Sequence, residues 1–406
     1  MSADTAIAQV KELFAAQYGA DPTGVWAAPG RVNLIGEHVD YAGGVCLPFA
    51  LNQCTYVAAS PREDERIRIC SVLPGDSEPV ATECAAGSLG PGDIEGWVGY
   101  ALGPIWALRE AGTLPSDPRG YDLAIVSEVP LGSGLSSSAA IECAVGSAVV
   151  ELELGSESLA DPSVRSELIA AAIRAENDVV GASTGGLDQS IAMSGQSGHA
   201  LKIDFLHGET MQVPFDLDGH GLAILIIDSK APHSLADGQY ASRRGVIDAV
   251  AASAEAPTLR AIGDADAIEA AARAWAEKEG YDLDVALRRV RHVSSEIDRT
   301  LHAIELLRND DFEGFGADMY ASHASLRDDY EVTVPQLDLI VDTAREFGAI
   351  GARMTGGGFG GSAIALVRRE DVEPLSQRIA QAFEDAHFDP PAFLAATPSE
   401  GARRVA

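Results

Sequence analysis

The chain has 406 residues, 46% of them hydrophobic and 22% charged, which is typical of a soluble globular protein long enough for two domains. Its 61 acidic and 29 basic residues give a formal net charge of -32, which disfavours nucleic acid and anionic membranes as partners. The 5 cysteines are an odd number without a Cys-x-x-Cys pair, and we identify no signal peptide or membrane span, so we expect a cytoplasmic protein.

Hydrophobic periodicity predicts mostly strands in the first third of the chain. An amphipathic helix with Phe14 and Tyr18 on one face precedes short strands, expected over residues 24–28, 44–51, 55–60 and 66–71. Residues 75–92, rich in Gly, Pro and Asp, predict a loop. A helix over 97–110 and a strand over 121–129 then lead into a glycine- and serine-rich segment.

The remainder is predicted to be mainly helical. Residues 204–220 are expected to connect two strands, and the apolar run 221–228 predicts a buried strand. A helix should begin at Asp161-Pro162, an N-cap followed by proline. Further helices are expected over residues 137–152, 242–254, 264–277, 284–308, 335–347 and 372–386. Strands early and helices late favour an α+β fold over a doubly wound sheet.

Residues 130–140 combine the end of a strand, a glycine-rich turn and the start of a helix. Gly132 and Gly134 allow a ligand to approach the backbone, and the serines at the helix start present N–H groups and hydroxyls. The helix dipole adds positive potential, so the segment predicts a phosphate-binding loop. It is not a Walker loop and has no lysine nearby, so phosphates there would need Mg²⁺ for neutralisation. A solvated linker, the alternative, would not lead directly into an Ala-rich helix.

Charged side chains are concentrated within residues 30–44. Arg31, Glu37, His38 and Asp40 lie close together in a segment that is otherwise apolar and rich in glycine. Carboxylates and an imidazole can bond several hydroxyl groups at once, so a polyol or sugar is the expected partner. A surface turn with an ion-paired arginine is the alternative that spacing alone leaves open.

Two other glycine-rich segments are less informative by themselves. Asp188 follows a pair of glycines, and it is either a base or a helix cap; the local pattern does not distinguish them. The glycine cluster over 355–361 permits close packing on a ligand or another loop, but alone it favours a tight hairpin before a strand over 362–367.

Taken together, these segments resemble the motifs of a known enzyme family. Residues 30–41 resemble the galactokinase signature, residues 130–140 the second GHMP kinase motif and residues 356–361 the third. Their order and separations also match. Tyr240 and residues 322–330 extend the similarity, so the resemblance spans nearly the whole chain.

The resemblance implies a two-domain α+β GHMP kinase fold with mixed sheets and helices and an active site between the domains. An N-terminal domain over residues 1–200 would carry the sugar signature and the ATP loop, and a C-terminal domain over 201–406 the third motif. The implied protein is a cytoplasmic enzyme with a small sugar as its partner. We expect a monomer, with a dimer as the alternative.

The implied activity is phosphorylation of galactose by ATP at the anomeric hydroxyl. Asp188 matches the catalytic aspartate, and Arg31 matches the arginine that pairs with it and stabilises the transferring phosphoryl group. Ser138 and Glu176 match the Mg²⁺ ligands. The sugar contacts correspond to Glu37, His38, Asp40, Gly185 and Tyr240. The ATP contacts correspond to Gly132, Ser133, Gly134, Leu135, Ser136, Ser137 and Ser138, with Ser71 and Trp97 as further nucleotide contacts.

The chain departs from the family pattern at few positions. Val39 stands where the family often has Thr, and Gly186 and Leu187 replace a bulkier pair, so Gly186 is predicted to widen the pocket near the sugar. The alternatives are a GHMP kinase for a related sugar, such as N-acetylgalactosamine or arabinose, and a non-catalytic galactose and ATP sensor. A sensor predicts a damaged phosphate loop or loss of Asp188, and the sequence keeps both.

Overall fold

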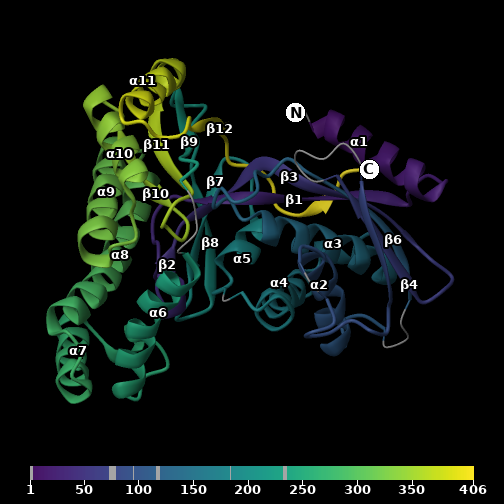
Figure 1. The fold of residues 1–406 in the computed structure, drawn as a ribbon, viewed down its shortest axis with the longest axis horizontal. Helices are drawn as coiled ribbons and strands as arrows, with labels where there is room; N and C mark the ends of the chain where they lie inside the picture. Colours follow the sequence, from purple (N-terminus) through teal and green to yellow (C-terminus); the bar gives the residue numbers. More distant parts are fainter. Residues whose placement is uncertain (1–2, 73–78, 95, 116–118, 183, 232–235) are drawn as a thin grey trace.

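The computed structural model describes residues 3–72, 79–94, 96–115, 119–182, 184–231 and 236–406. Figure 1 shows a large sheet with its helices on one side of the molecule and a second group of helices on the other. The six strands, in spatial order, are β13 (Arg403–Arg404), β1 (Gly24–Asn33), β3 (Pro48–Pro61), β6 (Tyr121–Ser127), β4 (Arg66–Ser71) and β5 (Val80–Ala85). All neighbours pair antiparallel except β4 and β6, which are parallel.

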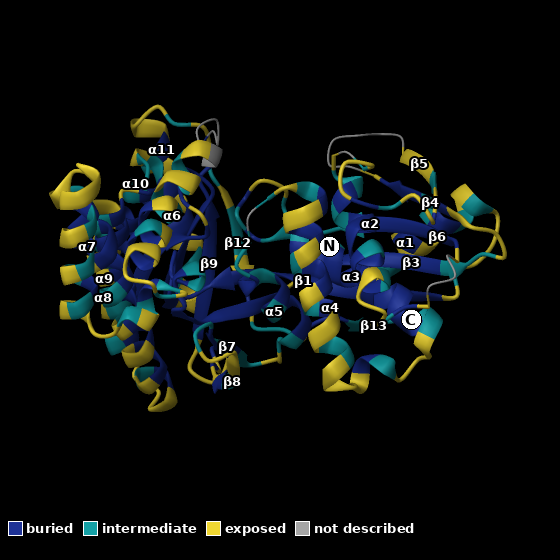
Figure 2. Ribbon diagram, turned by 90° about the horizontal axis from the view of Figure 1, so that it is seen from below, coloured by how far each residue is buried: buried dark blue, intermediate teal, exposed yellow. Residues whose placement is uncertain are grey.

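Helices cover both faces of this sheet, which explains why every residue of β1 is buried. Val25 and Ala27 pack beneath α1 (Ala3–Tyr18), whereas Trp26 and Ala28 face the opposite layer. That layer contains α2 (Val98–Glu110), α3 (Ser137–Leu154) and α4 (Pro162–Arg174), with α5 (Leu187–Ser194) packed on α3. Figure 2 shows the resulting buried interior with exposed residues on the outer helices.

The second half is built on a four-stranded sheet in the order β10 (Gly351–Thr355), β11 (Ser362–Arg368), β9 (Leu222–Asp228) and β12 (Ala392–Ala396). Its helices are α6 (Ala236–Ser253), α7 (Ala265–Glu279), α8 (Leu283–Arg308), α9 (Phe312–Ser325), α10 (Pro335–Phe347) and α11 (Val372–Asp385). A small third sheet contains β2 (Val45–Cys46), β7 (His199–Asp204) and β8 (Glu209–Pro214). Mixed sheets and helices of this kind confirm the predicted α+β class.

Several sequence-based elements differ from the structure. The strands expected over 44–51 and 55–60 are largely one strand, β3, because the polar Asn52 and Gln53 lie within the strand rather than in a turn. β5 lies in the predicted loop, of which residues 75–78 are outside the described residues, and β8 lies in the predicted connection. Both strands lie at sheet edges; β5 is mostly exposed and lacks apolar alternation, whereas the alternation in β8 is limited to residues 210–213.

The two halves meet where β1 ends. The hydroxyl oxygen of Thr355, the last residue of β10, accepts a hydrogen bond at 3.3 Å from the N–H of Asn33, the last residue of β1. The C-terminal strand β13 returns to the first half and pairs with β1. The domain boundary near residue 200 stays a prediction. The described residues contain no helix with the length and apolar character required for a membrane span.

Candidate active site

A polar cavity of about 210 Å³ lies between the two halves. It is lined by Arg31, Gly36, Glu37, His38, Asp40, Glu176, Thr184, Gly185, Leu187, Asp188, Tyr240, Gly356 and Gly357. The lining brings together the charged segment after β1, the start of α5, Tyr240 of α6 and the glycine turn after β10. Sequence segments more than 300 residues apart therefore form one site.

The centre of the cavity is an ion pair between Arg31 and Asp188. The Nε and Nη2 atoms of Arg31 donate to the two oxygens of Asp188 at 2.8 and 3.0 Å, in a bidentate arrangement. Nη1 of Arg31 donates to the carbonyl oxygen of Gly134 at 2.6 Å, and the Ser136 hydroxyl donates to Asp188. Asp188 is thus not the cap of α5, which is preceded by Gly186 in a left-handed conformation.

The glycine-serine segment forms a turn that leads into α3, as the sequence predicts. Gly132, Gly134 and Ser136 have positive φ angles of 70°, 77° and 58°. The first turn of α3 begins at Ser137, and no side chain caps it. A Cβ atom at Gly132 would have no neighbour within 4 Å, so the turn is open on that side. An open turn with N–H groups at a helix start fits a phosphate group.

Three carboxylates lie near this turn with few cations to balance them. Gln189 is fully buried, and its amide nitrogen donates to Glu176 at 2.6 Å and to Glu142 at 3.0 Å. Burial, then the nearby Asp188, raises the pKa of Glu176 to about 7, and the nearby Gln189 and Ser138 side chains act in the opposite direction. Burial and the charge of Glu176 raise the pKa of Glu142 well above its ordinary range.

This surplus of negative charge fits a divalent cation. Within the described residues, no group of three or more His, Cys, Asp or Glu side chains is arranged to hold a metal ion. Mg²⁺ seldom needs such a group, because one or two protein oxygens and substrate phosphates commonly suffice. Ser138 and Glu176 offer a hydroxyl and a carboxylate beside the phosphate-binding turn, and one oxygen of Glu142 has no hydrogen-bond partner.

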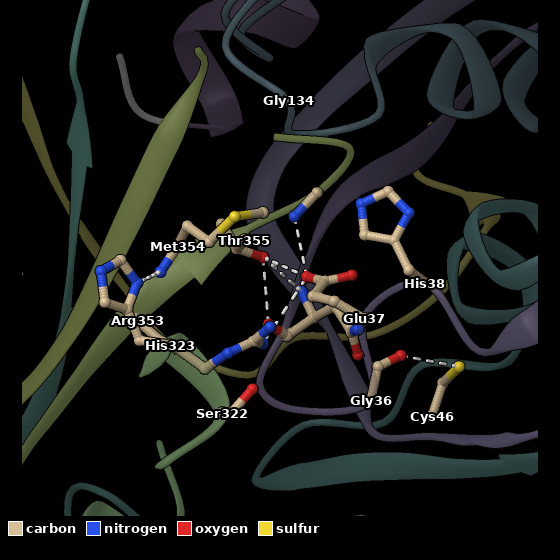
Figure 3. A network of polar contacts seen from close by, with 12 residues as sticks. Gly36, Glu37, His38, Cys46, Gly134, Ser322, His323, Arg353, Met354 and Thr355 are labelled. Carbon is tan, nitrogen blue, oxygen red and sulfur yellow. Dashed lines mark hydrogen bonds and ion pairs between the residues drawn. The ribbon is translucent and has the colours of Figure 1, made fainter. Parts of the chain in front are cut away.

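On the opposite side of the cavity, Glu37 is held by the glycine turn after β10 (Figure 3). Its Oε1 atom accepts hydrogen bonds from the Gly356 N–H at 2.7 Å and the Thr355 hydroxyl at 3.2 Å. Arg353 lies 3.6 Å from the same oxygen. The glycine cluster is therefore a hairpin loop, as its local pattern favours, and it also forms part of the cavity wall.

His38 uses both ring nitrogens within the protein. Burial lowers the pKa of His38 to about 3, so the ring is neutral at physiological pH. Nε2 lies 3.1 Å from the Gly357 carbonyl oxygen, which can only accept, so Nε2 carries the hydrogen. Nδ1 then accepts from the Tyr41 hydroxyl at 3.2 Å, and Tyr41 accepts from Tyr330 at 2.7 Å. His38 can therefore contact a ligand only through its backbone or the edge of its ring.

Asp40, Gly185 and Tyr240, which the sequence predicts as sugar contacts, also line this cavity. Burial is the largest cause that raises the pKa of Asp40 to about 6, and Asp188 and Glu37 add repulsion. A Cβ atom on Gly185 would lie 2.1 Å from Oδ2 of Asp40, so glycine is required for this close approach. The predicted role of Gly186 is wrong: it does not line the cavity, and a Cβ there would meet Ile173 at 2.4 Å. Its φ of 93° instead explains the glycine.

The two remaining predicted nucleotide contacts lie outside this cavity. Ser71 ends β4 and pairs in register with Ile125 of β6. Trp97 directly precedes α2 and packs against the core beneath the six-stranded sheet. Ser71 belongs to the six-stranded sheet and Trp97 to the start of α2, and neither lines the cavity that contains the Arg31–Asp188 pair.

Sequence reasoning missed several polar residues around the cavity. Glu142 carried a usable signal, because it follows Ser138 by four residues in a helix and so lies on the same face. Gln189 was adjacent to Asp188 but had no distinguishing pattern. Arg353 and Glu296 are completely buried, and nothing in the local sequence indicated that two distant charges would meet there.

Family models describe the same segments. A model named galactokinase galactose-binding signature matches residues 12–61. Models for the N-terminal domain and the C-terminal part of GHMP kinases match residues 99–196 and 303–385. Two mevalonate kinases have the same fold, one of them from Methanococcus jannaschii with a TM-score of 0.61 at 17% identity over 93% of this chain and 98% of its own. Fold and motifs together define a GHMP kinase.

Comparison with individual proteins shows to which family of GHMP kinases the chain belongs. A galactokinase from Streptomyces coelicolor is 42% identical over 397 residues, which are 98% of each chain, and one from Homo sapiens is 40% identical over 366 residues, 89% of this chain and 88% of its own. The crystal structure of Lactococcus lactis galactokinase complexed with galactose matches with a TM-score of 0.86 and 30% identity, covering 98% of this chain and all of its own. The chain belongs to the galactokinase family.

Proposed function

We propose that this chain transfers the γ-phosphoryl group of ATP to the anomeric hydroxyl of galactose, with Asp188 and Arg31 at the reacting atoms. The observation that carries the proposal is the bidentate Arg31–Asp188 pair, which lies between the phosphate-binding turn and the polar sugar side of one cavity. The products are galactose 1-phosphate and ADP.

In this mechanism Asp188 accepts the proton of the anomeric hydroxyl. The hydroxyl oxygen forms a bond to the γ-phosphorus as the bond from phosphorus to the bridging oxygen of ADP breaks. The Arg31 and Ser136 bonds fix both oxygens of Asp188, so the carboxylate is held in one orientation. Arg31 also bonds the Gly134 carbonyl, which places a permanent positive charge beside the turn that would hold the phosphates.

We assign Ser138 and Glu176 as the protein ligands of Mg²⁺. The ion supplies neutralisation of phosphate charge when it is bound. Ser138 and Glu176 orient it, and the Gln189 amide holds Glu176 in place. The loop from Gly132 to Ser138 binds the ATP phosphates through backbone N–H groups, and Ser71 and Trp97 are proposed to extend the nucleotide site.

Galactose is the proposed sugar because the cavity offers carboxylates to several hydroxyl groups. Glu37 and Asp40 accept hydroxyl hydrogens, Gly185 admits Asp40, and Tyr240 closes the side formed by α6. An assay of ADP release with galactose, 2-deoxygalactose, N-acetylgalactosamine, arabinose and glucose tests the assignment. Turnover should be fastest with galactose; turnover with another of these sugars but not with galactose would overturn it, and no turnover with any would support a sensor.

The remaining proposals concern the setting of the enzyme. We propose that it works in the cytoplasm as a monomer, supported by the odd number of cysteines, all 5 of which are free. Two domains divided near residue 200 are proposed from the motif order. Sedimentation of the purified chain and limited proteolysis test the monomer and the boundary.

A further inference from the structure

Arg353 is a charged residue that the reaction described above does not use. It lies in β10 between Ala352 and Met354, and its side chain is 0% exposed. A buried guanidinium is costly unless nearby negative charge offsets the loss of water. Buried strands ordinarily have apolar residues at such positions, so the charge of Arg353 needs an explanation.

The negative charge that balances Arg353 comes from two segments on either side of it. Glu37, after β1, places Oε1 at 3.6 Å from Nη1, and the same Nη1 donates to the Asn33 carbonyl oxygen at 3.2 Å. Arg353 is also the leading cation that lowers the pKa of Glu296 in α8, a carboxylate with 0% exposure. Arg353 thus joins the sugar-signature segment to the second half of the molecule.

Hydrogen bonding alone does not account for this arginine. Within the described residues, its Nε and Nη2 atoms have no hydrogen-bond partner. A neutral side chain of similar size would lose little hydrogen bonding, but it would remove the cation beside Glu37 and leave Glu296 with Arg299 as its ion-pair partner. The role of Arg353 is therefore mainly electrostatic.

The consequence is a fixed orientation of Glu37 (Figure 3). Oε1 is held by Arg353, the Thr355 hydroxyl and the Gly356 N–H. The backbone is held as well, because the Glu37 N–H donates to Glu296 at 3.4 Å and the Glu37 carbonyl oxygen lies 3.1 Å from Nε2 of His292. With Oε1 occupied, Oε2 is the oxygen that remains for a ligand in the cavity that Glu37 lines.

We propose that Arg353 is a positioning residue for sugar binding, which holds Oε1 of Glu37 so that Oε2 faces the sugar hydroxyl groups. The proposal rests on the proposed contact between Glu37 and galactose. It makes a selective prediction: loss of the Arg353 charge weakens galactose binding and leaves ATP binding intact, because among the described residues Arg353 contacts Asn33 and Glu37 rather than the phosphate-binding turn.

Arg353→Met and Arg353→Lys test the charge, and Arg299→Met is the matched control. Arg299 is a mostly buried partner of the same Glu296, but it does not contact Glu37. For Arg353→Met we expect the galactose KM to rise by about tenfold or more, since removing one partner of a buried charge pair is strongly unfavourable, with the ATP KM within about twofold. Arg353→Lys should restore much of the affinity, and Arg299→Met should leave the galactose KM near wild type.

The outcomes separate the inference from the function on which it rests. Calorimetry of galactose binding to Glu37→Gln is measured in parallel. If Glu37→Gln binds galactose with unchanged affinity, Glu37 does not contact the sugar, and that part of the proposed function is wrong. If Glu37→Gln binds galactose weakly but Arg353→Met binds it normally, only the positioning role is overturned. The same conclusion follows if the galactose KM and the ATP KM rise equally in the Arg353 and Arg299 variants.

Thr355→Val keeps the proposal testable if Arg353→Met does not fold. This variant retains side-chain shape and removes the hydroxyl that donates to Oε1 of Glu37. We expect a rise of about threefold or more in the galactose dissociation constant and no change for ATP. Unchanged galactose binding in a folded Thr355→Val protein would contradict the positioning of Glu37 through Oε1.

Discussion

The carboxylates at the two ends of the cavity differ in how their charge is balanced. At the sugar end, Glu37 is neutralised by Arg353, and Glu296 behind it by Arg353 and Arg299. At the phosphate end, Glu142 and Glu176 share one neutral amide, and burial raises both of their pKa values. Asp188, with its partner Arg31, lies between the two ends.

The difference shows what each end has to bind. A neutral sugar carries no charge to balance, so the sugar end is complete when the protein supplies its own cations. The phosphate end has two carboxyl groups beside a loop that suits phosphates, and we propose that Mg²⁺ binds there together with the phosphates. Each of the following variants changes a residue at the centre or at one end of the cavity and so tests this difference.

The largest effect is expected for Asp188→Asn, which breaks the centre of the cavity. The amide keeps the shape but cannot take the hydroxyl proton, so kcat should fall by about three orders of magnitude. Stopped assays of ADP release measure the change, and calorimetry checks that galactose and ATP still bind. A kcat within a few-fold of wild type would show that Asp188 is not the base.

Glu176→Gln should remove the charge at the phosphate end. We expect the Mg²⁺ concentration for half-maximal activity to rise on the order of tenfold to a hundredfold. Asp178→Asn is the matched control, because Asp178 lies in the same π-helical segment but is exposed and pairs only with Arg174. Mg²⁺ titrations of ATP binding by calorimetry provide a readout independent of turnover. Equal Mg²⁺ requirements in the two variants would rule out the ligand role of Glu176.

Gly185→Ala and Gly186→Ala should separate sugar binding from folding. A methyl group at Gly185 collides with the Asp40 carboxylate, so the galactose KM should rise by about tenfold while the melting temperature changes little. A methyl group at Gly186 is strained at φ 93°, so the free energy of unfolding should fall by about 1–2 kcal/mol. Denaturant titration and galactose kinetics measure both; the opposite pairing of effects would show that Gly186 borders the sugar.

The smallest effect is a pH dependence at the sugar end. Asp40 faces Asp188 and Glu37, which raise its pKa, and Arg244, which lowers it; burial dominates and brings the pKa to about 6. Ionised Asp40 accepts sugar hydroxyls better, so galactose affinity should increase several-fold between pH 5 and pH 7. The raised pKa also means that the contribution of Asp40 to stability is lost as the pH rises through about 6. Asp40→Asn should flatten the binding curve, and an unchanged curve would exclude this residue.

The sequence predicted the parts of this account that depend on local pattern. The phosphate-binding turn followed from glycines and serines between a strand and a helix, and β9 followed from an unbroken apolar run. Edge strand β5 was missed because its exposed residues lack alternation, and β8 was missed because its alternation covers only residues 210–213. The Arg353–Glu37 contact joins residues 316 apart in number, and no local pattern encodes such a meeting of charges.

The roles of individual residues also divide into those that local sequence predicts and those that depend on the fold. The alternatives for Asp188, base or cap, required the fold to separate them, because only the structure shows its side chain turned to Arg31. The widening expected from Gly186 was wrong because the direction of a missing side chain depends on backbone angles that composition does not reveal.

Calorimetry of the wild-type protein with and without Mg²⁺ tests the contrast between the two ends most directly. Galactose and ATP are titrated separately, in Mg²⁺ and in excess chelator. The galactose dissociation constant should stay within about twofold, whereas that of ATP should weaken by about tenfold or more when Mg²⁺ is removed. ATP binding that is equally tight in chelator, or galactose binding that is lost with the metal, would contradict the account.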